Sequence, residues 1–254
     1  MSAPPFLKVS GVGVAGRLHD ISFDWVQGST IAIVGPSGSG KTTLLRLLAG
    51  FEAPDQGCIE LDGQAVSSAG RVLVPPERRR LTYAFQEPAL MPHLDAIGNV
   101  HLAGQRVDPG RLAAARQALA DVGLAGLERR PVWELSGGEA QRVQLARTLA
   151  AQARLWLLDE PFASVDRMCR ADLLFRIGDR LRRRGKDGIA AIVTHDPVDA
   201  MELADLTLVL QAGRMVAFGR FEHIAAGAYG AWPAQFLASG LRGGEMAADR
   251  VSGD

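Results

Sequence analysis

Three short apolar runs recur along this chain of 254 residues, and each is followed at once by glycine or by polar residues. The runs occupy residues 31–34, 155–158 and 189–193. Runs of this length are typical of buried strands in a parallel sheet, whose side chains face apolar layers on both sides. Because ligands of parallel sheets gather at the carboxyl edge, the residues after each run are predicted to share one site.

The stretches between these runs predict other kinds of structure. Turn signals are dense over residues 59–83, which indicates short antiparallel strands beside the main sheet. Residues 94–150 are predicted to be mainly helical, since apolar residues recur at helical spacing from Leu112 to Val122. The last stretch, residues 219–254, is rich in glycine and alanine and weakly patterned, so its end is predicted to be loose.

Composition narrows the class of protein. Hydrophobic residues make up 47% of the chain, which is enough for a sizeable core, and 28 Lys+Arg are matched by 28 Asp+Glu. That even balance argues against a nucleic-acid partner, since such proteins carry a basic excess. The two cysteines lack metal-ligand spacing, and there is neither a signal peptide nor a run of the roughly 18 apolar residues that span a bilayer. The sequence therefore predicts a soluble, cytoplasmic chain.

Residues 35–42, Gly-Pro-Ser-Gly-Ser-Gly-Lys-Thr, match the pattern of a phosphate-binding loop. A predicted strand precedes the loop and a predicted helix over residues 42–49 follows it, which disfavours a glycine turn that binds nothing. Glycine lets backbone N–H groups face phosphate oxygens, and the helix N-terminus adds its positive dipole end. Lys41 would supply charge to the β- and γ-phosphates, and the Thr42 hydroxyl can bind Mg²⁺. The residues expected to bind nucleotide are Gly35, Pro36, Ser37, Gly38, Ser39, Gly40, Lys41, Thr42 and Thr43.

Asp159 and Glu160 follow the second apolar run and would complete a nucleotide site. A carboxylate at a strand end can hold Mg²⁺ together with Thr42, and its neighbour can orient or deprotonate an attacking water, as in-line phosphoryl transfer requires. Taken alone, such a pair is more often a helix cap or a salt-bridged pair. Its place after a phosphate loop favours Asp159 as a metal ligand and Glu160 as the general base.

Residues 135–142, Leu-Ser-Gly-Gly-Glu-Ala-Gln-Arg, narrow the choice among nucleotide hydrolases. A Ser-Gly-Gly at the start of a helix, expected from Glu139 onward, offers free N–H groups to an anion. Ser136 and Glu139 also satisfy the capping-box pattern, and both functions can hold at once. The segment resembles the signature of ABC-type ATPases, and the resemblance extends over roughly residues 6–220.

This resemblance implies an α/β fold, namely a phosphate-loop ATPase core with a mostly parallel sheet, an antiparallel β subdomain and an inserted helical subdomain over about residues 90–150. The ABC ATPase domain would span residues 1–225, and residues 226–254 would form a short C-terminal tail. The resemblance also implies hydrolysis of ATP, with ATP and Mg²⁺ as cofactors.

Three further marks of the family follow in its usual order, namely Gln86, Asp166 within a Ser-Val-Asp segment, and His195. Each is weak alone, because a lone glutamine or histidine is more often structural. By the resemblance, Gln86 would contact Mg²⁺ or the attacking water and respond to a membrane partner. His195 would contact the γ-phosphate, and Asp166 would help to organise the opposite subunit.

The family's arrangement implies a homodimer in which two copies face head-to-tail. Lys41 and Glu160 of one copy would enclose ATP against Ser136, Gly137 and Gly138 of the other. A single copy would then hold half of each site.

The sequence departs from the family at one place that touches nucleotide binding. The family usually has an aromatic ring near residues 12–14 that stacks on adenine, whereas residues 11–16 contain none. Stacking contributes about 1 to 3 kcal/mol per base in nucleic-acid complexes, so its absence predicts weaker nucleotide binding. Glu139 in place of glutamine and Val165 in place of leucine are mild changes.

Residues 71–80, 83–93 and 208–219 most resemble the ATPase subunit of a molybdate-type bacterial importer. That subunit normally continues into an oxyanion-sensing domain, which a chain ending at Asp254 is too short to include, so feedback by the imported anion is not expected. The expected function is import of a small anion such as molybdate. Importers of thiamine, sulfate or other solutes are alternatives, because this subunit does not touch the cargo.

The resemblance implies integral-membrane permease subunits as partners, and a periplasmic solute-binding protein indirectly, with the chain peripheral on the inner face of the cell membrane. Leu90, Met91 and Leu94 would form either a groove for a permease helix or the core of the helical insert, and the sequence favours neither. A soluble ABC protein of translation or DNA repair would ordinarily carry a second ATPase copy or a long coiled coil. A phosphate-loop kinase or GTPase is disfavoured by residues 135–138.

Overall fold

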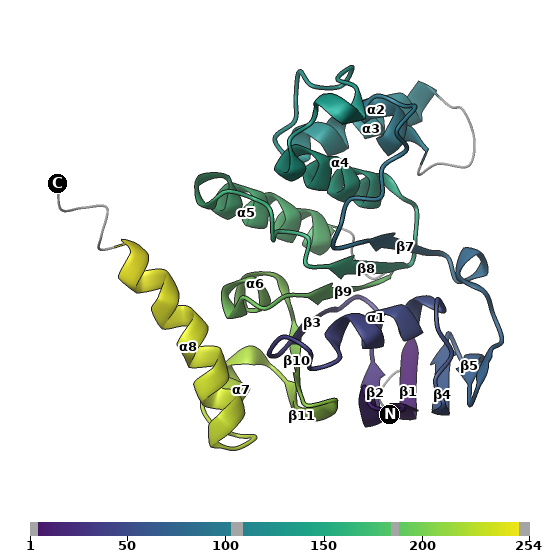
Figure 1. The fold of residues 1–254 in the computed structure, drawn as a ribbon, viewed down its shortest axis with the longest axis vertical. Helices are drawn as coiled ribbons and strands as arrows, with labels where there is room; N and C mark the ends of the chain where they lie inside the picture. The colour runs from purple at the N-terminus through teal and green to yellow at the C-terminus, as the bar shows by residue number, and fades with distance from the viewer. Residues whose placement is uncertain (1–4, 103–108, 184–187, 249–254) are drawn as a thin grey trace.

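A six-stranded sheet forms the centre of the described part of the chain, which comprises residues 5–102, 109–183 and 188–248 of a computed structural model (Figure 1). Its strand order is β11-β10-β3-β9-β8-β7, and all neighbours pair in parallel except β10 and β11. The strands are β3 (Thr30–Val34), β7 (Leu81–Ala84), β8 (Leu155–Asp159), β9 (Ile189–Val193), β10 (Leu206–Gln211) and β11 (Arg214–Gly219). Strands β3, β8 and β9 are buried at every position, which confirms the strands predicted from the three apolar runs.

A five-stranded antiparallel sheet, ordered β2-β1-β4-β5-β6, is the second sheet of the fold. Its strands are β1 (Leu7–Val14), β2 (Leu18–Trp25), β4 (Gln56–Leu61), β5 (Gln64–Ser68) and β6 (Arg71–Val72). The antiparallel region predicted over residues 59–83 ends too late, because residues 81–83 belong to β7 and pair in parallel with β8. The predicted region also begins too late, because the sheet includes the N-terminal hairpin of β1 and β2, and β1 pairs with β4.

Helices pack against both faces of the central sheet (Figure 1). They are α1 (Lys41–Ala49), α2 (Ala96–His101), α3 (Pro109–Asp121), α4 (Gly137–Ala150), α5 (Arg167–Arg183), α6 (Pro197–Leu203), α7 (Phe221–Ala225) and α8 (Ala231–Ala248), with 3₁₀ turns at Pro76–Arg78 and Val132–Glu134. Leucines of α1 pack with Leu155 and Leu157, whereas apolar residues of α4 pack with Trp156 and Leu158. Because alternate residues of a strand face opposite sides, α1 and α4 lie on opposite faces of the sheet.

The helices α2, α3 and α4 pack on one another and form the segment inserted between β7 and β8. Ala115, Leu119 and Val122 are buried, which confirms the amphipathic helix predicted there. Its C-terminal turn is followed by Gly123, whose φ of 72° is easily reached without a side chain. Within the described residues, none of the helices combines the length and the apolar character needed to cross a bilayer.

The tail predicted over residues 226–254 contains a helix that the weak pattern did not indicate. This helix, α8, has 18 residues and contacts α6 and α7. Leu237 is buried, and the rings of Trp232 and Phe236 stack with centroids 5.4 Å apart. Packing of these residues outweighs the low helix propensity of the glycines in the segment. Residues 249–254, the predicted loose end, lie outside the described residues, and the domain boundaries stay predictions.

Arg79 joins the antiparallel sheet to the helix that follows the phosphate loop. Its side chain is almost fully buried and donates five hydrogen bonds of 2.7–3.3 Å. Two of them reach carbonyls of the last turn of α1, where the negative end of the helix dipole suits a cation. Burial lowers the pKa of Arg79 to about 10, so the guanidinium is still charged at neutral pH. The acceptors are the carbonyls of Leu47, Leu48, Val66 and Val74 and the hydroxyl of Ser67.

Arg79→Met should lower the free energy of unfolding by about 3 kcal/mol or more, because it leaves several buried acceptors without donors. Urea unfolding measures the difference. The neighbouring Arg78 is exposed, so Arg78→Met should change the same quantity by less than about 0.5 kcal/mol. Equal unfolding midpoints for the two variants would contradict the role assigned to Arg79.

Candidate active site

The phosphate loop runs from the end of β3 to the start of α1, and its backbone leaves no room for a side chain at two glycine positions. Gly35 has φ 153°, and a Cβ atom there would lie 2.2 Å from the carbonyl oxygen of Leu210. Gly40, with φ 100°, caps α1 without any side-chain hydrogen bond to its N-terminal N–H groups. The buried hydroxyl of Ser39 likewise has no hydrogen-bond partner. Unpaired donors at a helix N-terminus are what a phosphate group binds, so the loop fits that ligand.

Lys41 places its ammonium group within the curve of this loop. Its Nζ donates to the carbonyl oxygens of Gly35 at 2.8 Å and Pro36 at 2.9 Å. Burial lowers the pKa of Lys41, while the charges of Glu160 and Asp159 act to raise it. The only positive side chain of the loop is therefore held by two backbone carbonyls, and the charges of two carboxylates stabilise its charged form.

Asp159 ends β8 and is held by two hydroxyl donors. Its two carboxylate oxygens accept hydrogen bonds of 3.1 Å, one from Thr42 Oγ1 and one from the Tyr83 hydroxyl. Burial raises the pKa of Asp159, although the hydrogen bonds from Thr42 and Tyr83 act to lower it. Thr42, Gln86 and Asp159 line one cavity of about 340 Å³. Hydroxyl, carboxylate and amide oxygens are ligands that suit Mg²⁺, so these side chains fit the metal.

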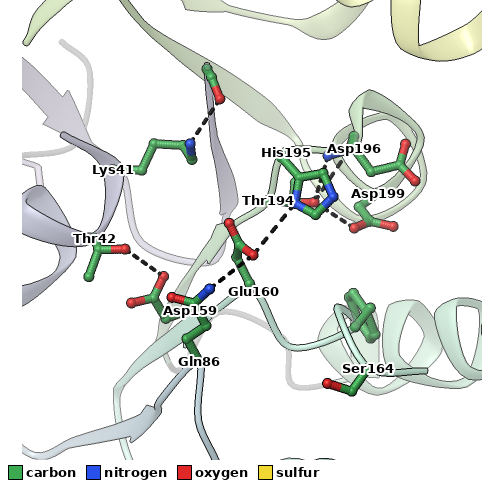
Figure 2. A network of polar contacts seen from close by, with 12 residues as sticks. Lys41, Thr42, Gln86, Asp159, Glu160, Ser164, Thr194, His195, Asp196 and Asp199 are labelled. Atoms are coloured by element: carbon green, nitrogen blue, oxygen red, sulfur yellow. Dashed lines mark hydrogen bonds and ion pairs between the residues drawn. The ribbon is translucent and has the colours of Figure 1, made fainter. Parts of the chain in front are cut away.

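Glu160 lies at the carboxyl edge of the sheet, between the ends of the adjacent strands β7 and β9. Its Oε2 atom is 3.5 Å from Gln86 Nε2, which follows β7, and 3.5 Å from His195 Nδ1, which follows β9 (Figure 2). The Glu160 side chain is 19% exposed and that of His195 is 64% exposed, so the imidazole faces outward while the carboxylate is sheltered. Glu160 also has φ 47°, a conformation that costs a non-glycine residue free energy and is frequent at functional sites.

Two buried glutamines of α4 brace the loops of this site, and sequence reasoning missed both. Gln141 donates to the carbonyl of Glu160 at 2.8 Å and accepts from the N–H of Ser164 at 3.0 Å. Gln144 hydrogen-bonds to the backbone on both sides of Gln86, at 2.5 and 2.9 Å. The available signal was their position about one and two turns beyond the Ser-Gly-Gly segment, on the buried face of a helix.

The Ser-Gly-Gly segment forms the N-terminus of α4, which begins at Gly137 rather than at the predicted Glu139. The capping box is present, since Ser136 Oγ accepts from the N–H of Glu139 and Glu139 Oε2 accepts from the N–H of Ser136. The backbone hydrogen bond from Ser136 lowers the pKa of Glu139. Because α4 and α1 lie on opposite faces of the sheet, Ser136, Gly137 and Gly138 are not brought to the phosphate loop of their own chain.

The segment expected to face adenine offers no platform of its own. Val12 and Val14 are buried in the core of the antiparallel sheet, and residues 15–16 form an exposed turn. Arg17 follows that turn, and its guanidinium is paired with Glu52 at 2.8 Å.

The parallel sheet carries a glycine loop after β3, before the helix that begins with Lys41, and a carboxylate pair at the end of β8, two strands away. This combination defines a nucleotide-binding protein of the phosphate-loop class. Comparison with known families gives a narrower assignment. The family model described as ABC transporter matches residues 18–163, more than half of the chain. The chain belongs to the ABC transporter family.

Several relatives are similar over most of this chain. The Fe(3+) ions import ATP-binding protein FbpC of Mesorhizobium japonicum is 43% identical over 220 residues, covering 84% of this chain and 60% of that protein. FbpC of Pseudomonas fluorescens is 44% identical over 208 residues, covering 82% and 58%. The aliphatic sulfonates import ATP-binding protein SsuB 3 of Rhodococcus jostii is 41% identical over 215 residues, covering 83% and 73%. The chain thus spans about three fifths of the length of the two FbpC relatives.

Two solved structures share the fold. A dimeric, post-hydrolysis state of the ATP-binding cassette MJ0796 bound to ADP and Pi superposes with a TM-score of 0.73 at 25% identity, covering 85% of this chain and 98% of that one. CbiO1 of Clostridium perfringens, part of the ABC transporter complex CbiONQ, superposes with a TM-score of 0.74 at 23% identity, covering 89% and 93%. The predicted fold class, with its parallel core, antiparallel sheet and helical insert, is confirmed.

Asp159→Asn should raise the free energy of unfolding at neutral pH by about 0.5 to 2 kcal/mol, the range typical of relieving a destabilised site. The pKa of Asp159 in the folded protein lies above its ordinary value, so ionisation destabilises the fold and stability falls as the pH rises through the raised pKa. The gain should shrink at about pH 4 and below, where the carboxyl group is increasingly protonated in both states. Urea unfolding at both pH values measures the gain, and an equal gain at the two would contradict its electrostatic origin.

Proposed function

We propose that this chain is the ATPase subunit of an importer of the ABC family, which hydrolyses ATP to drive a solute through a separate membrane permease. The observation that carries the proposal is the meeting of Gln86, Glu160 and His195 beside the Thr42–Asp159 pair at one sheet edge. The names of the relatives support import, and they favour the alternative of another solute over molybdate, since they specify Fe(3+) ions and aliphatic sulfonates.

In this proposal the triphosphate of ATP binds at the phosphate loop, over Gly35, Pro36, Ser37, Gly38, Ser39, Gly40, Lys41, Thr42 and Thr43. The unpaired N–H groups of the loop and of α1 bind phosphate oxygens, and Lys41 exchanges its backbone acceptors for the β- and γ-phosphates. Thr42, Gln86 and Asp159 would hold Mg²⁺, which supplies positive charge opposite the phosphate oxygens when bound.

Glu160 is the proposed general base. Its carboxylate is sheltered and has Gln86 on one side and His195 on the other, so a water held there has an acceptor for its proton and two groups that orient it. Phosphoryl transfer depends mainly on such positioning and on charge. The exposed imidazole of His195 is then free to meet the γ-phosphate.

The proposed active unit is a homodimer. The N-terminus of α4 carries the exposed Ser136 and Gly137 and the less exposed Gly138, on the face of the sheet opposite to α1. The first N–H groups of a helix have no partner within it, so this end suits the phosphates of a nucleotide on another copy. The dimeric state of the similar ATP-binding cassette supports a dimer, and the head-to-tail arrangement is part of the proposal.

Permease contact is proposed for the surface next to Gln86. Leu90 packs against the core of the helical insert, whereas Met91 is 44% exposed. Leu94 is partly buried, so Met91 is the best candidate of the three for a partner contact. The chain would lie on the inner face of the cell membrane, and a periplasmic solute-binding protein would act on it only through the permease.

Glu160→Gln should lower ATP turnover about a hundredfold or more, the usual cost of losing a general base. With Mg²⁺ and ATP present, the variant should accumulate as an ATP-bound dimer on gel filtration, while the parent chain returns to monomer after hydrolysis. Turnover within a few-fold of the parent would show that Glu160 is misassigned, and a variant that binds ATP only as a monomer would contradict the dimer.

Met91→Asp should lower ATP-driven uptake about tenfold or more in vesicles that contain the permease, because a charge replaces an apolar contact at the interface. Met201 is 42% exposed on α6 and serves as the matched control, so Met201→Asp should leave uptake unchanged. Equal uptake by the two variants would remove Met91 from the permease contact.

A further inference from the structure

A partly buried ion-pair network joins Arg170, in the first turn of α5, to Asp196 and Asp199, which follow His195 in the sequence. Nη2 of Arg170 donates to both carboxylate oxygens of Asp199 at 2.9 Å and to Asp196 Oδ2 at 3.1 Å. The guanidinium is 21% exposed and the Asp199 side chain 2% exposed. One nitrogen of the guanidinium is therefore shared between two carboxylates, and its charge is held by both of them.

The same guanidinium also holds the segment that follows Glu160. Nη1 of Arg170 donates to the carbonyl of Phe162 at 3.0 Å, and the charge lies over the Phe162 ring at 5.9 Å. The helix that carries Arg170 is capped by Asp166, whose carboxylate accepts from the N–H of Cys169 at 3.0 Å. Arg170 therefore ties the segment running from Glu160 to Asp166 to the residues around His195.

Thr194 continues the network to the backbone of His195. Its hydroxyl donates to Asp199 at 2.6 Å and accepts from the N–H of Asp196 at 3.0 Å. Both sequence neighbours of His195 are thus held by the network, whereas the imidazole is 64% exposed and lies 3.5 Å from Glu160 (Figure 2). The place of the imidazole is fixed through its backbone neighbours, and these are fixed by Asp199 and Arg170.

We propose that Arg170 is a positioning residue, which holds His195 at the distance from Glu160 that the reaction requires and makes this distance depend on the segment 162–166. The proposal rests on the proposed ATPase function. Its physical basis is that one guanidinium contacts both loops, so a shift of one must be matched by the other unless the pair with the buried Asp199 breaks.

Arg170→Lys tests this with no change in charge, because the single ammonium group of lysine cannot replace two separate nitrogens, one on Asp199 and Asp196 and one on the Phe162 carbonyl. The variant should lower kcat for ATP about tenfold, with KM for ATP within about twofold of the parent, since the phosphate loop is untouched. Arg176 makes an exposed pair with Asp172 on the same helix, so Arg176→Lys is the matched control and should leave both constants unchanged. Thr194→Val keeps the shape of the side chain and should act in the same direction as Arg170→Lys.

A double variant separates positioning from general support of the fold. In a His195→Ala background, measured by single-turnover hydrolysis of labelled ATP, Arg170→Lys should cost less than about twofold, because the group it positions is gone. An equal cost in both backgrounds, or a kcat for Arg170→Lys within about twofold of the parent, would overturn the proposal.

Histidine resonances supply a measurement that does not need hydrolysis. The chain has five histidines, and the signal of His195 is assigned by its loss in His195→Ala. Arg170→Lys should shift or broaden this signal while Arg176→Lys leaves it in place; an unchanged signal overturns the proposal. If Arg170→Lys shifts the signal but the parent chain does not hydrolyse ATP, the result would support the contact between Arg170 and the His195 loop and reject the proposed function.

Discussion

The parallel register of β7, β8 and β9 is the constraint on which the site depends. Ala84 and Leu158 lie side by side in adjacent strands, and β9 continues the same register. Gln86, Glu160 and His195 therefore leave their strands at nearly the same level and at the same edge. A slip of one residue in any of these strands would turn its side chains to the other face of the sheet and disperse the group. Burial of every residue in β8 and β9 prevents such a slip.

The loops at this edge are held by buried or partly buried polar side chains, in addition to the contacts of Glu160 with Gln86 and His195. Gln141 and Gln144 bind the backbone of two loops, Arg170 joins one of these to the loop after β9, and Arg79 anchors the far end of α1. Each of these groups is expensive to bury unless its hydrogen bonds are made, so each loop is held in one arrangement. The side chains of Glu160 and His195, by contrast, keep part of their surface open.

Local signals predicted much of this arrangement, and long-range pairing explains what they missed. The glycine loop, the strand ends and the capping box depend on neighbours in sequence, so spacing predicts the glycine loop before the helix that carries Lys41 and the capping of a helix by Ser136. The role of Gln141 depends on a contact with residues about 20 positions away, which no local pattern encodes. The helix α8 was missed because its glycines and alanines carry little periodicity, and its place is fixed by packing of Leu237.

Gly138 has a consequence for how two nucleotide sites would communicate. A Cβ atom at this position would lie 2.7 Å from the carbonyl oxygen of Ser164. The backbone at the N-terminus of α4 therefore packs directly against the backbone of the segment after Glu160. Such a contact has no soft side chain to absorb a displacement. In the proposed head-to-tail pair, the N-terminus of α4 would meet the partner's nucleotide and push directly on the segment that follows Glu160, the proposed general base of its own chain. The two sites would then behave as one mechanical element, with neither able to close while the other is held open.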